Sequence, residues 1–147
     1  MKFFRWFLML VTLAGLAVDA YVHLKLAGSY PSNRGSITEP FLFRAEAVLA
    51  IAAALFLLVH SSRWSASLAA LVAAGGLGAL LLYRYVDVGA VGPLPNMYEP
   101  FWFTDKTWCA VAQGLATVAA AALAITSSTA ASSGPSRKIR ATSAHSR

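Results

Sequence analysis

The stretch FLFRAEAVLAIAAALFLLVH, residues 41–60, decides the fold of this chain. At ~1.5 Å per residue, a helix of this length crosses the ~30 Å hydrocarbon core of a bilayer. Three further apolar runs of similar length occupy residues 4–24, 66–86 and 106–126. Because lipid offers the backbone no hydrogen-bond partners, each run is expected to be a helix. The sequence therefore predicts an all-α membrane protein, a bundle of four transmembrane helices.

The composition supports this prediction. Of the 147 residues, 58% are hydrophobic and only 12% are charged, and the mean hydropathy is +0.61. About a quarter of the residues are charged in a soluble domain. We predict one transmembrane domain at 1–126 and, because residues 127–147 are Ser/Ala-rich and basic, a disordered cytoplasmic tail. The single cysteine, Cys109, excludes an internal disulfide and is predicted to be a small apolar filler within a helix.

The charge distribution predicts an orientation. The net charge is +6, but the basic residues lie at the chain ends and beside apolar runs. This pattern is typical of membrane topology and not of a phosphate-binding face, so no nucleic-acid partner is expected. With the N-terminus in the cytoplasm, seven of the twelve Lys and Arg residues lie on the cytoplasmic side. We therefore predict a multi-pass protein of the cell membrane with both termini cytoplasmic. All six acids then fall toward the outer side: Asp19, Glu39, Glu46, Asp87, Glu99 and Asp105.

The N-terminal segment has a second interpretation. Its basic start MKFFRWF, the apolar run that follows and the VDA sequence ending at Ala20 also resemble a cleavable signal peptide. The apolar character continues to Leu26, however, which favours a first transmembrane helix. Cleavage is kept as the alternative.

A short phrase occurs twice: EPFLF at residues 39–43 returns as EPFWF at residues 99–103. Proline suits the first turn of a helix, and glutamate there favours the positive end of the helix dipole. Glu39, Pro40, Glu99 and Pro100 are therefore predicted to mark outer-face helix starts, with a binding role at that face as the alternative. The duplication also suggests two repeated helical hairpins, a parallel repeat.

Asp19 carries the strongest functional signal. It lies ~7 Å beyond the middle of the first apolar run, where a charge costs at least ~2.5 kcal/mol. His23 follows one turn later on the same face. The simplest neutralisation is an ion pair between Asp19 and Arg44, which falls at a similar depth in the second run. The candidate intramembrane polar site comprises Asp19, His23, Arg44, Glu46 and Arg84.

Two interpretations of this polar layer remain open. Its charges either lock neighbouring helices together or form a site open to the outside for an ion, a proton, a lipid headgroup or a small ligand. Arg44 and Glu46 are two residues apart and point to different faces of a helix, so they cannot serve one narrow pocket equally.

Two features of the sequence indicate how the helices pack. Ala74 and Gly78 form a small-xxx-small pair, which is typical of close helix contacts in lipid. Gln113 is predicted to form a hydrogen bond across helices, in a packing role.

His23 and His60 lie at opposite ends of their helices, which argues against a bis-histidine haem. The sequence has no HExxH or GxSxG motif and no glycine-rich phosphate loop. We therefore predict no catalytic residue, no metal and no cofactor.

Three phrases carry a family resemblance: DAYVHLKLAGSY (19–30), EPFLF (39–43) and YRYVDVGAVGPLPNMYEPF (83–101). Together they resemble uncharacterised small four-helix integral membrane proteins of actinobacteria, over roughly residues 10–125. That resemblance implies membrane localisation and fold only, because the family has no assigned function. A looser likeness to DoxX-type proteins is confined to the number of helices.

The sequence supports two hypotheses of function. The first is a non-enzymatic membrane protein that binds a partner protein or lipid, or supports a membrane complex. Four helices of this size enclose little room alone, so a homo-oligomer or a membrane protein partner is expected beside the lipid bilayer. The alternative is a small proton- or ion-coupled transporter that uses Asp19 and Glu46.

Overall fold

The computed structural model describes residues 1–30 and 37–132, with side chains up to residue 127. The described residues form four helices and no strand: α1 (Lys2–Ser29), α2 (Glu39–Val59), α3 (Arg63–Tyr85) and α4 (Thr104–Ser132). All four are long and apolar enough to cross a membrane. The predicted all-helical, multi-pass architecture is therefore confirmed at this level.

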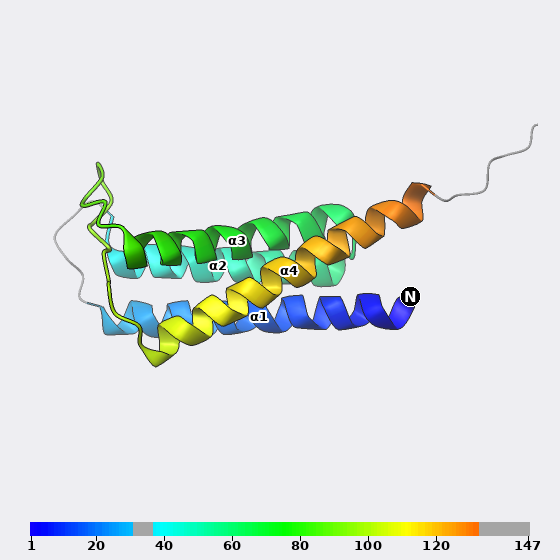
Figure 1. The fold of residues 1–147 in the computed structure, drawn as a ribbon, viewed down its shortest axis with the longest axis horizontal. Coiled ribbons are helices and arrows are strands. Elements are labelled where there is room, and N and C mark those ends of the chain that lie inside the picture. Colours follow the sequence, from blue (N-terminus) through cyan, green and yellow to red (C-terminus); the bar gives the residue numbers. More distant parts are fainter. Residues whose placement is uncertain (31–36, 133–147) are drawn as a thin grey trace, which may run out of the picture.

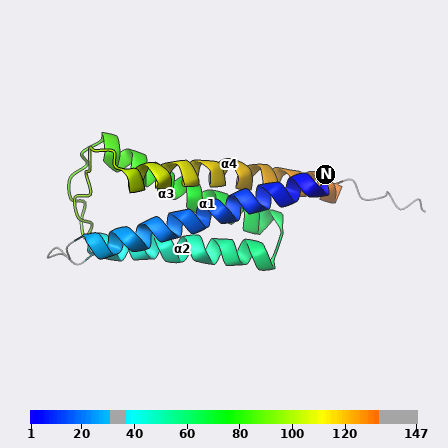
Figure 2. The same cartoon turned by 90° about the horizontal axis from the view of Figure 1, so that it is seen from below.

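The four helices run alternately up and down (Figure 1). We call the end where α1 and α3 stop and α2 and α4 begin the loop end, and the opposite end, which carries the N-terminus, the terminal end. Helix α4 packs along both α1 and α3, and α1 packs along α2, as the turned view also shows (Figure 2). The first and the last helix, α1 and α4, are therefore in extensive contact, which closes the four-helix bundle.

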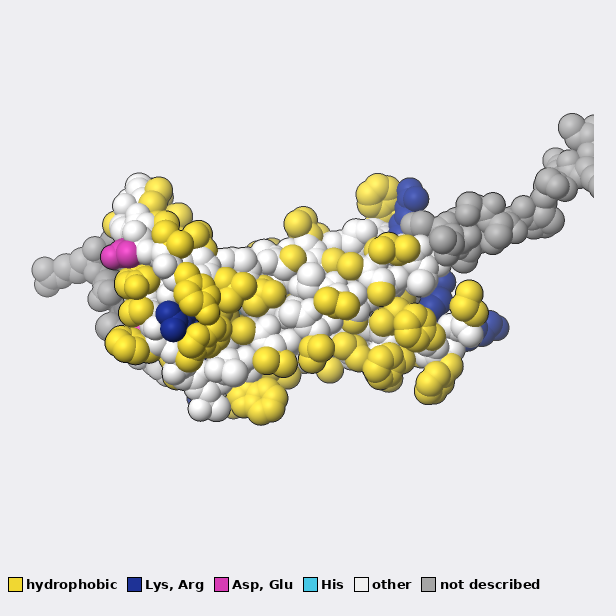
Figure 3. Space-filling view, in the orientation of Figure 1, with side chains coloured by type: hydrophobic (Ala, Val, Ile, Leu, Met, Phe, Trp, Pro, Cys, Tyr) yellow, Lys and Arg dark blue, Asp and Glu magenta, His cyan; other side chains and the backbone are white. Residues whose placement is uncertain are grey.

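The outside of the bundle is apolar along most of its length. Figure 3 shows hydrophobic side chains over the middle of one face, Lys and Arg toward both ends, and acidic side chains only at the loop end. Large side chains such as Val48 on α2, Leu71 on α3 and Val118 on α4 are more than half exposed. These surfaces suit a hydrocarbon environment.

Local capping explains where α2 and α3 begin. The Thr38 hydroxyl accepts a hydrogen bond from the Phe41 N–H at 3.3 Å, and Pro40 occupies the first turn of α2. The predicted helix start at Glu39 and Pro40 is therefore confirmed. At α3, Ser62 and Ser65 form a reciprocal capping box.

The second copy of the repeated phrase does not start a helix, contrary to the prediction. Glu99 and Pro100 lie in an extended segment, and α4 begins only at Thr104. The backbone of Glu99 is used for tertiary contacts instead. Its N–H donates to the Tyr83 carbonyl at 3.0 Å, and its carbonyl accepts from Lys106 Nζ at 2.7 Å. The repeated-hairpin interpretation stays a prediction.

The predicted limits of the helices need adjustment. Helix α1 continues to Ser29 where residue 24 was predicted, and α4 continues to Ser132, into the predicted disordered tail. The rest of that tail, residues 133–147, lies outside the described residues. The predicted orientation, with both termini cytoplasmic, also stays a prediction.

Small residues hold the helices close together. Ala47, Ala50 and Ala53 on α2 are at most 1% exposed, as are the core alanines of α3. On α1, a methyl group at Gly15 would come within 2.7 Å of the Ala112 carbonyl oxygen on α4. Such stripes let backbones approach each other in lipid.

The predicted small-xxx-small pair of α3 is not part of this packing. Ala74 and Gly78 lie on the exposed face of α3. The buried stripe instead contains Ala66, Ala69 and Ala73. Close packing of α3 through small residues is therefore observed, but through residues other than the predicted pair.

Candidate functional site

A fully buried carboxylate lies between α1 and α4. The side chain of Asp19 is 0% exposed, and its Oδ1 lies 2.8 Å from His23 Nδ1, one helical turn further along α1. The same imidazole nitrogen lies 3.0 Å from the Asp19 backbone carbonyl. The spacing of four residues brings both side chains to one face of α1, as predicted.

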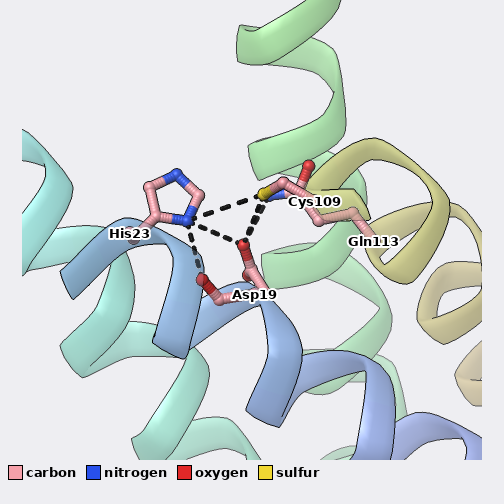
Figure 4. Close-up of polar contacts among 4 residues, drawn as sticks. All are labelled: Asp19, His23, Cys109 and Gln113. Atoms are coloured by element: carbon pink, nitrogen blue, oxygen red, sulfur yellow. Dashed lines mark hydrogen bonds and ion pairs between the residues drawn. The ribbon is translucent and has the colours of Figure 1, made fainter. Parts of the chain in front are cut away.

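Helix α4 supplies two more groups to this carboxylate (Figure 4). Gln113 Nε2 donates a hydrogen bond to Asp19 Oδ1 at 2.8 Å, and Cys109 Sγ donates to the same oxygen at 3.3 Å. Cys109 Sγ also lies 3.8 Å from His23 Nδ1. We call Asp19, His23, Cys109 and Gln113 the buried cluster. His23, Cys109 and Gln113 all contact the same oxygen atom, Asp19 Oδ1.

Several acceptors around the cluster lack donors. Asp19 Oδ2, Gln113 Oε1 and Glu46 Oε1 are buried, and none has a hydrogen-bond partner among the described residues. Buried polar atoms are normally satisfied by protein, by ordered water or by a ligand, because each unsatisfied one costs about 1–3 kcal/mol. The region around the cluster is therefore rich in unused acceptors.

Gly76 lets three helices meet at the cluster. A methyl group on Gly76 of α3 would come within 2.6 Å of Glu46 Oε1 from α2 and closer still to Gln113 Nε2 from α4. The ends of the Glu46 and Gln113 side chains therefore lie close together over the bare backbone of Gly76. The second carboxylate, Glu46, is in this way connected with the surroundings of Asp19.

A cavity of about 470 Å³ leads from the loop end to this region. Its deeper wall includes His23, Glu46, Gly76 and Cys109. Apolar and aromatic side chains of α1, α2 and α3 form much of the remaining wall, and the segment that precedes α4 lies near the mouth. Residues at or near the mouth are Tyr30, Glu39, Leu94, Asn96, Tyr98 and Glu99.

Glu99 organises the mouth of the cavity. The Tyr30 hydroxyl donates to Glu99 Oε2 at 3.3 Å, and the Tyr30 ring packs edge-on against Phe43 at 5.2 Å. Burial, followed by the charge of Glu99 and the hydrogen bond to it, raises the pKa of Tyr30 to about 12. Tyr30 therefore stays protonated and donates its hydrogen bond over the physiological pH range.

The predicted ion pair between Asp19 and Arg44 is wrong. Arg44 is exposed on α2, whereas Asp19 is fully buried against α4. Two residues along an α-helix turn the side chain by more than half a revolution, so Glu46 faces the cavity and Arg44 faces away. The expectation that these two neighbours cannot share a pocket is confirmed.

Arg84 also lies away from the buried cluster. Its guanidinium carbon is 4.9 Å from the centre of the Tyr85 ring and 5.5 Å from that of Trp102. These contacts are cation–π interactions at the loop end. Of the five predicted site residues, the structure thus brings Asp19, His23 and Glu46 to one region and leaves Arg44 and Arg84 elsewhere.

Two members of the cluster were given no functional role from the sequence. Cys109 was interpreted as an apolar filler and Gln113 as a packing residue, although its predicted cross-helix hydrogen bond is confirmed. A signal was present, because Cys109 and Gln113 are four residues apart, as are Asp19 and His23. This spacing places the two residues of each pair on one face of their helix.

Comparisons of the chain with protein-family models, with curated proteins and with solved structures found no match. The resemblance to small actinobacterial membrane proteins therefore stays a prediction. Any function for the cavity has to be argued from its own geometry and chemistry.

Proposed function

We propose that this chain is a small, non-enzymatic membrane protein that binds a positively charged small ligand in the cavity at its loop end. The observation that carries the proposal is a carboxylate that lines the cavity, Glu46, together with a second one, Asp19, that is buried against the lining residues His23 and Cys109. Asp19 and Glu46 each have a buried oxygen without a hydrogen-bond partner among the described residues. A cation supplies both the missing donor and the missing charge.

Burial within a membrane strengthens this argument. A carboxylate at bilayer depth is costly and is usually paired or part of a ligand pathway. Asp19 has one imidazole neighbour and otherwise neutral donors, and Glu46 Oε1 has no hydrogen-bond partner in the described part of the chain. A bound cation offsets the free-energy cost of burying the second carboxylate, that of Glu46, at bilayer depth.

The cavity limits the size and the character of the ligand. Its volume of about 470 Å³ lies within the range of roughly 300–1,000 Å³ common for small-molecule sites. Apolar residues such as Leu26, Leu42 and Leu49 line it beside the acids. The lining acids Glu39, Glu46 and Glu99 outnumber the lining lysine, Lys106, and this balance attracts cations. The site therefore suits a metal cation or a small organic ammonium ion with an apolar part.

The packing below the cavity favours binding over transport. One turn further toward the terminal end, each helix contributes an apolar residue that is at most 1% exposed: Leu16, Ala50, Ala73 and Ala116. The alternative of a small proton- or ion-coupled transporter would use the same carboxylates, Asp19 and Glu46, and would require this layer to open. We place the protein in the cell membrane with the loop end outside, beside lipid or a membrane protein partner.

The proposal is tested by calorimetric titration of the full-length protein in phosphatidylcholine nanodiscs. The probes are n-butylammonium and Zn²⁺, with n-butanol as the neutral counterpart and empty nanodiscs as the blank. We expect at least one cation to bind, and Glu46→Gln to weaken that binding about tenfold or more, the size of one lost charge-assisted contact.

Arg44→Gln is the matched control, because Arg44 lies on the same helix but is exposed. Its affinity for the cation is expected to equal that of the unmodified protein. If neither cation binds, or if n-butanol binds as tightly as n-butylammonium and Zn²⁺ does not bind, the proposal is wrong.

A further inference from the structure

We propose that Asp19, His23 and Cys109 form a binding site for a transition-metal ion of the zinc class at the deep end of the cavity. This inference rests on the proposed function and names the cation. No metal was predicted from the sequence, where Cys109 was interpreted as an apolar filler. Folding places a carboxylate oxygen, an imidazole nitrogen and a thiol sulfur within 4.8 Å of one another.

The distances suit tetrahedral coordination. With zinc bonds of ~2.3 Å to sulfur and ~2.0–2.2 Å to nitrogen or oxygen, tetrahedral ligand atoms lie roughly 3.4–3.6 Å apart. Cys109 Sγ is 3.3 Å from Asp19 Oδ1 and 3.8 Å from His23 Nδ1. Only the contact between His23 Nδ1 and Asp19 Oδ1, at 2.8 Å, has to widen when an ion binds between them.

The three donor types select the metal. Thiolate, imidazole and carboxylate ligands together suit Zn²⁺ and related transition metals, whereas Ca²⁺ and Mg²⁺ prefer oxygen ligands alone. Three protein ligands also leave one coordination position vacant. His23 and Cys109 both line the cavity, so a small ligand in the cavity has access to that position.

An independent observation points to a missing ligand. Asp19 and Gln113 are both 0% exposed, yet Asp19 Oδ2 and Gln113 Oε1 have no hydrogen-bond partner among the residues described. Buried polar atoms of this kind are normally satisfied by protein, ordered water or a ligand. A metal ion at the cluster supplies the missing partner of the Asp19 carboxylate.

Charge balance favours the same site in a bilayer. When the ion binds, the Cys109 thiol loses its proton to the surrounding water and the sulfur binds as thiolate. One thiolate, one carboxylate and one neutral imidazole then balance the two charges of Zn²⁺. A cluster without net charge is less costly at bilayer depth than an isolated carboxylate. Gln113 Nε2, which donates to Asp19, orients the carboxylate from the outer shell.

Cobalt substitution tests the site directly. The full-length protein, freed of any affinity tag and treated with chelator, is titrated with Co²⁺ in nanodiscs and followed by absorption spectroscopy. We expect a thiolate-to-cobalt charge-transfer band and intense tetrahedral bands that saturate at one ion per chain. Zn²⁺ is expected to displace Co²⁺ and to abolish these bands.

The variants separate coordination from folding. Cys109→Ser is expected to lose the charge-transfer band, and Asp19→Asn to weaken Zn²⁺ binding. Gln113→Leu, which changes only the outer shell, is expected to weaken it about 10- to 100-fold. His60→Gln, at the terminal end, leaves the band unchanged. Thermal melting of each variant identifies any that fails to fold, and His23→Gln then provides a second removed ligand.

The outcomes also separate this inference from the proposed function. If n-butylammonium binds in a Glu46-dependent manner but Co²⁺ gives no thiolate band, the metal site is wrong and the proposed function stands. The same conclusion follows if Zn²⁺ binds equally well to Cys109→Ser. If neither cation binds to the unmodified protein, both proposals fail.

Discussion

Gln113 Nε2 of α4 lies 2.8 Å from Asp19 Oδ1 of α1, so the most deeply buried acid of the bundle is held by a neutral amide across the helix interface. The thiol of Cys109 and the imidazole of His23 complete the surroundings of the same oxygen. This arrangement differs from a closed ion pair with arginine, because it leaves the second carboxylate oxygen unused.

The amide of Gln113 is expected to stabilise the contact between α1 and α4. Its replacement in Gln113→Ala removes a donor from a buried carboxylate, which costs about 1–3 kcal/mol. The free energy of unfolding, measured by detergent denaturation in mixed micelles, should fall accordingly. Leu115→Ala on the exposed face of the same helix is the control and should change stability much less. Equal effects of both substitutions would contradict a stabilising role for this hydrogen bond.

Gly15 is expected to be essential for the close approach of α1 and α4. An alanine Cβ at this position would lie 2.7 Å from the Ala112 carbonyl oxygen and 2.8 Å from Ala116 Cβ. Because backbone atoms cannot move aside without separating the helices, Gly15→Ala should destabilise the bundle by about 1–3 kcal/mol. Unfolding in the same micelles measures this loss.

Gly75→Ala is the matched control for Gly15→Ala. Gly75 is also helical, but a methyl group there would meet nothing within 4 Å. Its stability is expected to stay equal or to rise slightly, because alanine favours the helix. If the two variants unfold alike, α1 and α4 do not pack as closely as the structure indicates.

Gly76→Ala should weaken ligand binding. The added methyl group would contact the ends of the Glu46 and Gln113 side chains, and both of these are flexible. We expect the side chains to move away, so that cation affinity in nanodiscs falls. The loss of stability should not exceed that of Gln113→Ala, because the displaced Gln113 amide is the donor to Asp19. Gly78→Ala, with open space around the added carbon, is expected to keep full affinity. Unchanged cation binding by Gly76→Ala would show that Glu46 does not contribute to the cation site.

The helices could be predicted from the sequence, but their rotational settings could not. Apolar runs of sufficient length indicated the four helices, and Glu39 and Pro40 indicated one helix start correctly. Which of Arg44 and Glu46 faces inward depends on the packing of α2 against its neighbours. The structure buries Ala50 and Leu57, and a helical wheel places Glu46 on their side of α2, but the sequence alone did not show which side is buried.

The contact between Cys109 and Asp19 could not be predicted from the sequence for a different reason. A lone cysteine in an apolar helix usually packs as a small hydrophobic residue. Its contact with Asp19 spans ninety positions of the chain and depends on α1 lying beside α4. The second EPF phrase was misleading in the same way, because the tertiary contacts of Glu99 outweigh its local preference for a helix start.

Tyr30 should make the free energy of unfolding depend on pH in the alkaline range. Its folded-state pKa of about 12 lies above the ordinary value of 10.0, so the unfolded chain loses this proton first. The contribution of Tyr30 is therefore complete below pH 10 and is lost as the pH rises toward about 12. Tyr30→Phe should make this fall in unfolding free energy less steep. Tyr85→Phe, at an exposed ring, should leave the slope unchanged.

Cysteine labelling tests the predicted orientation, on which access to the cavity from outside depends. Cys109 is only 2% exposed, so an impermeant maleimide should not label the unmodified protein in intact cells. A cysteine in Val91→Cys, in the exposed segment at the loop end, should react from outside. A cysteine in His60→Cys, at the terminal end, should react only after the membrane is permeabilised. The opposite pattern would place the mouth of the cavity in the cytoplasm, and the cation would then have to come from the cell interior.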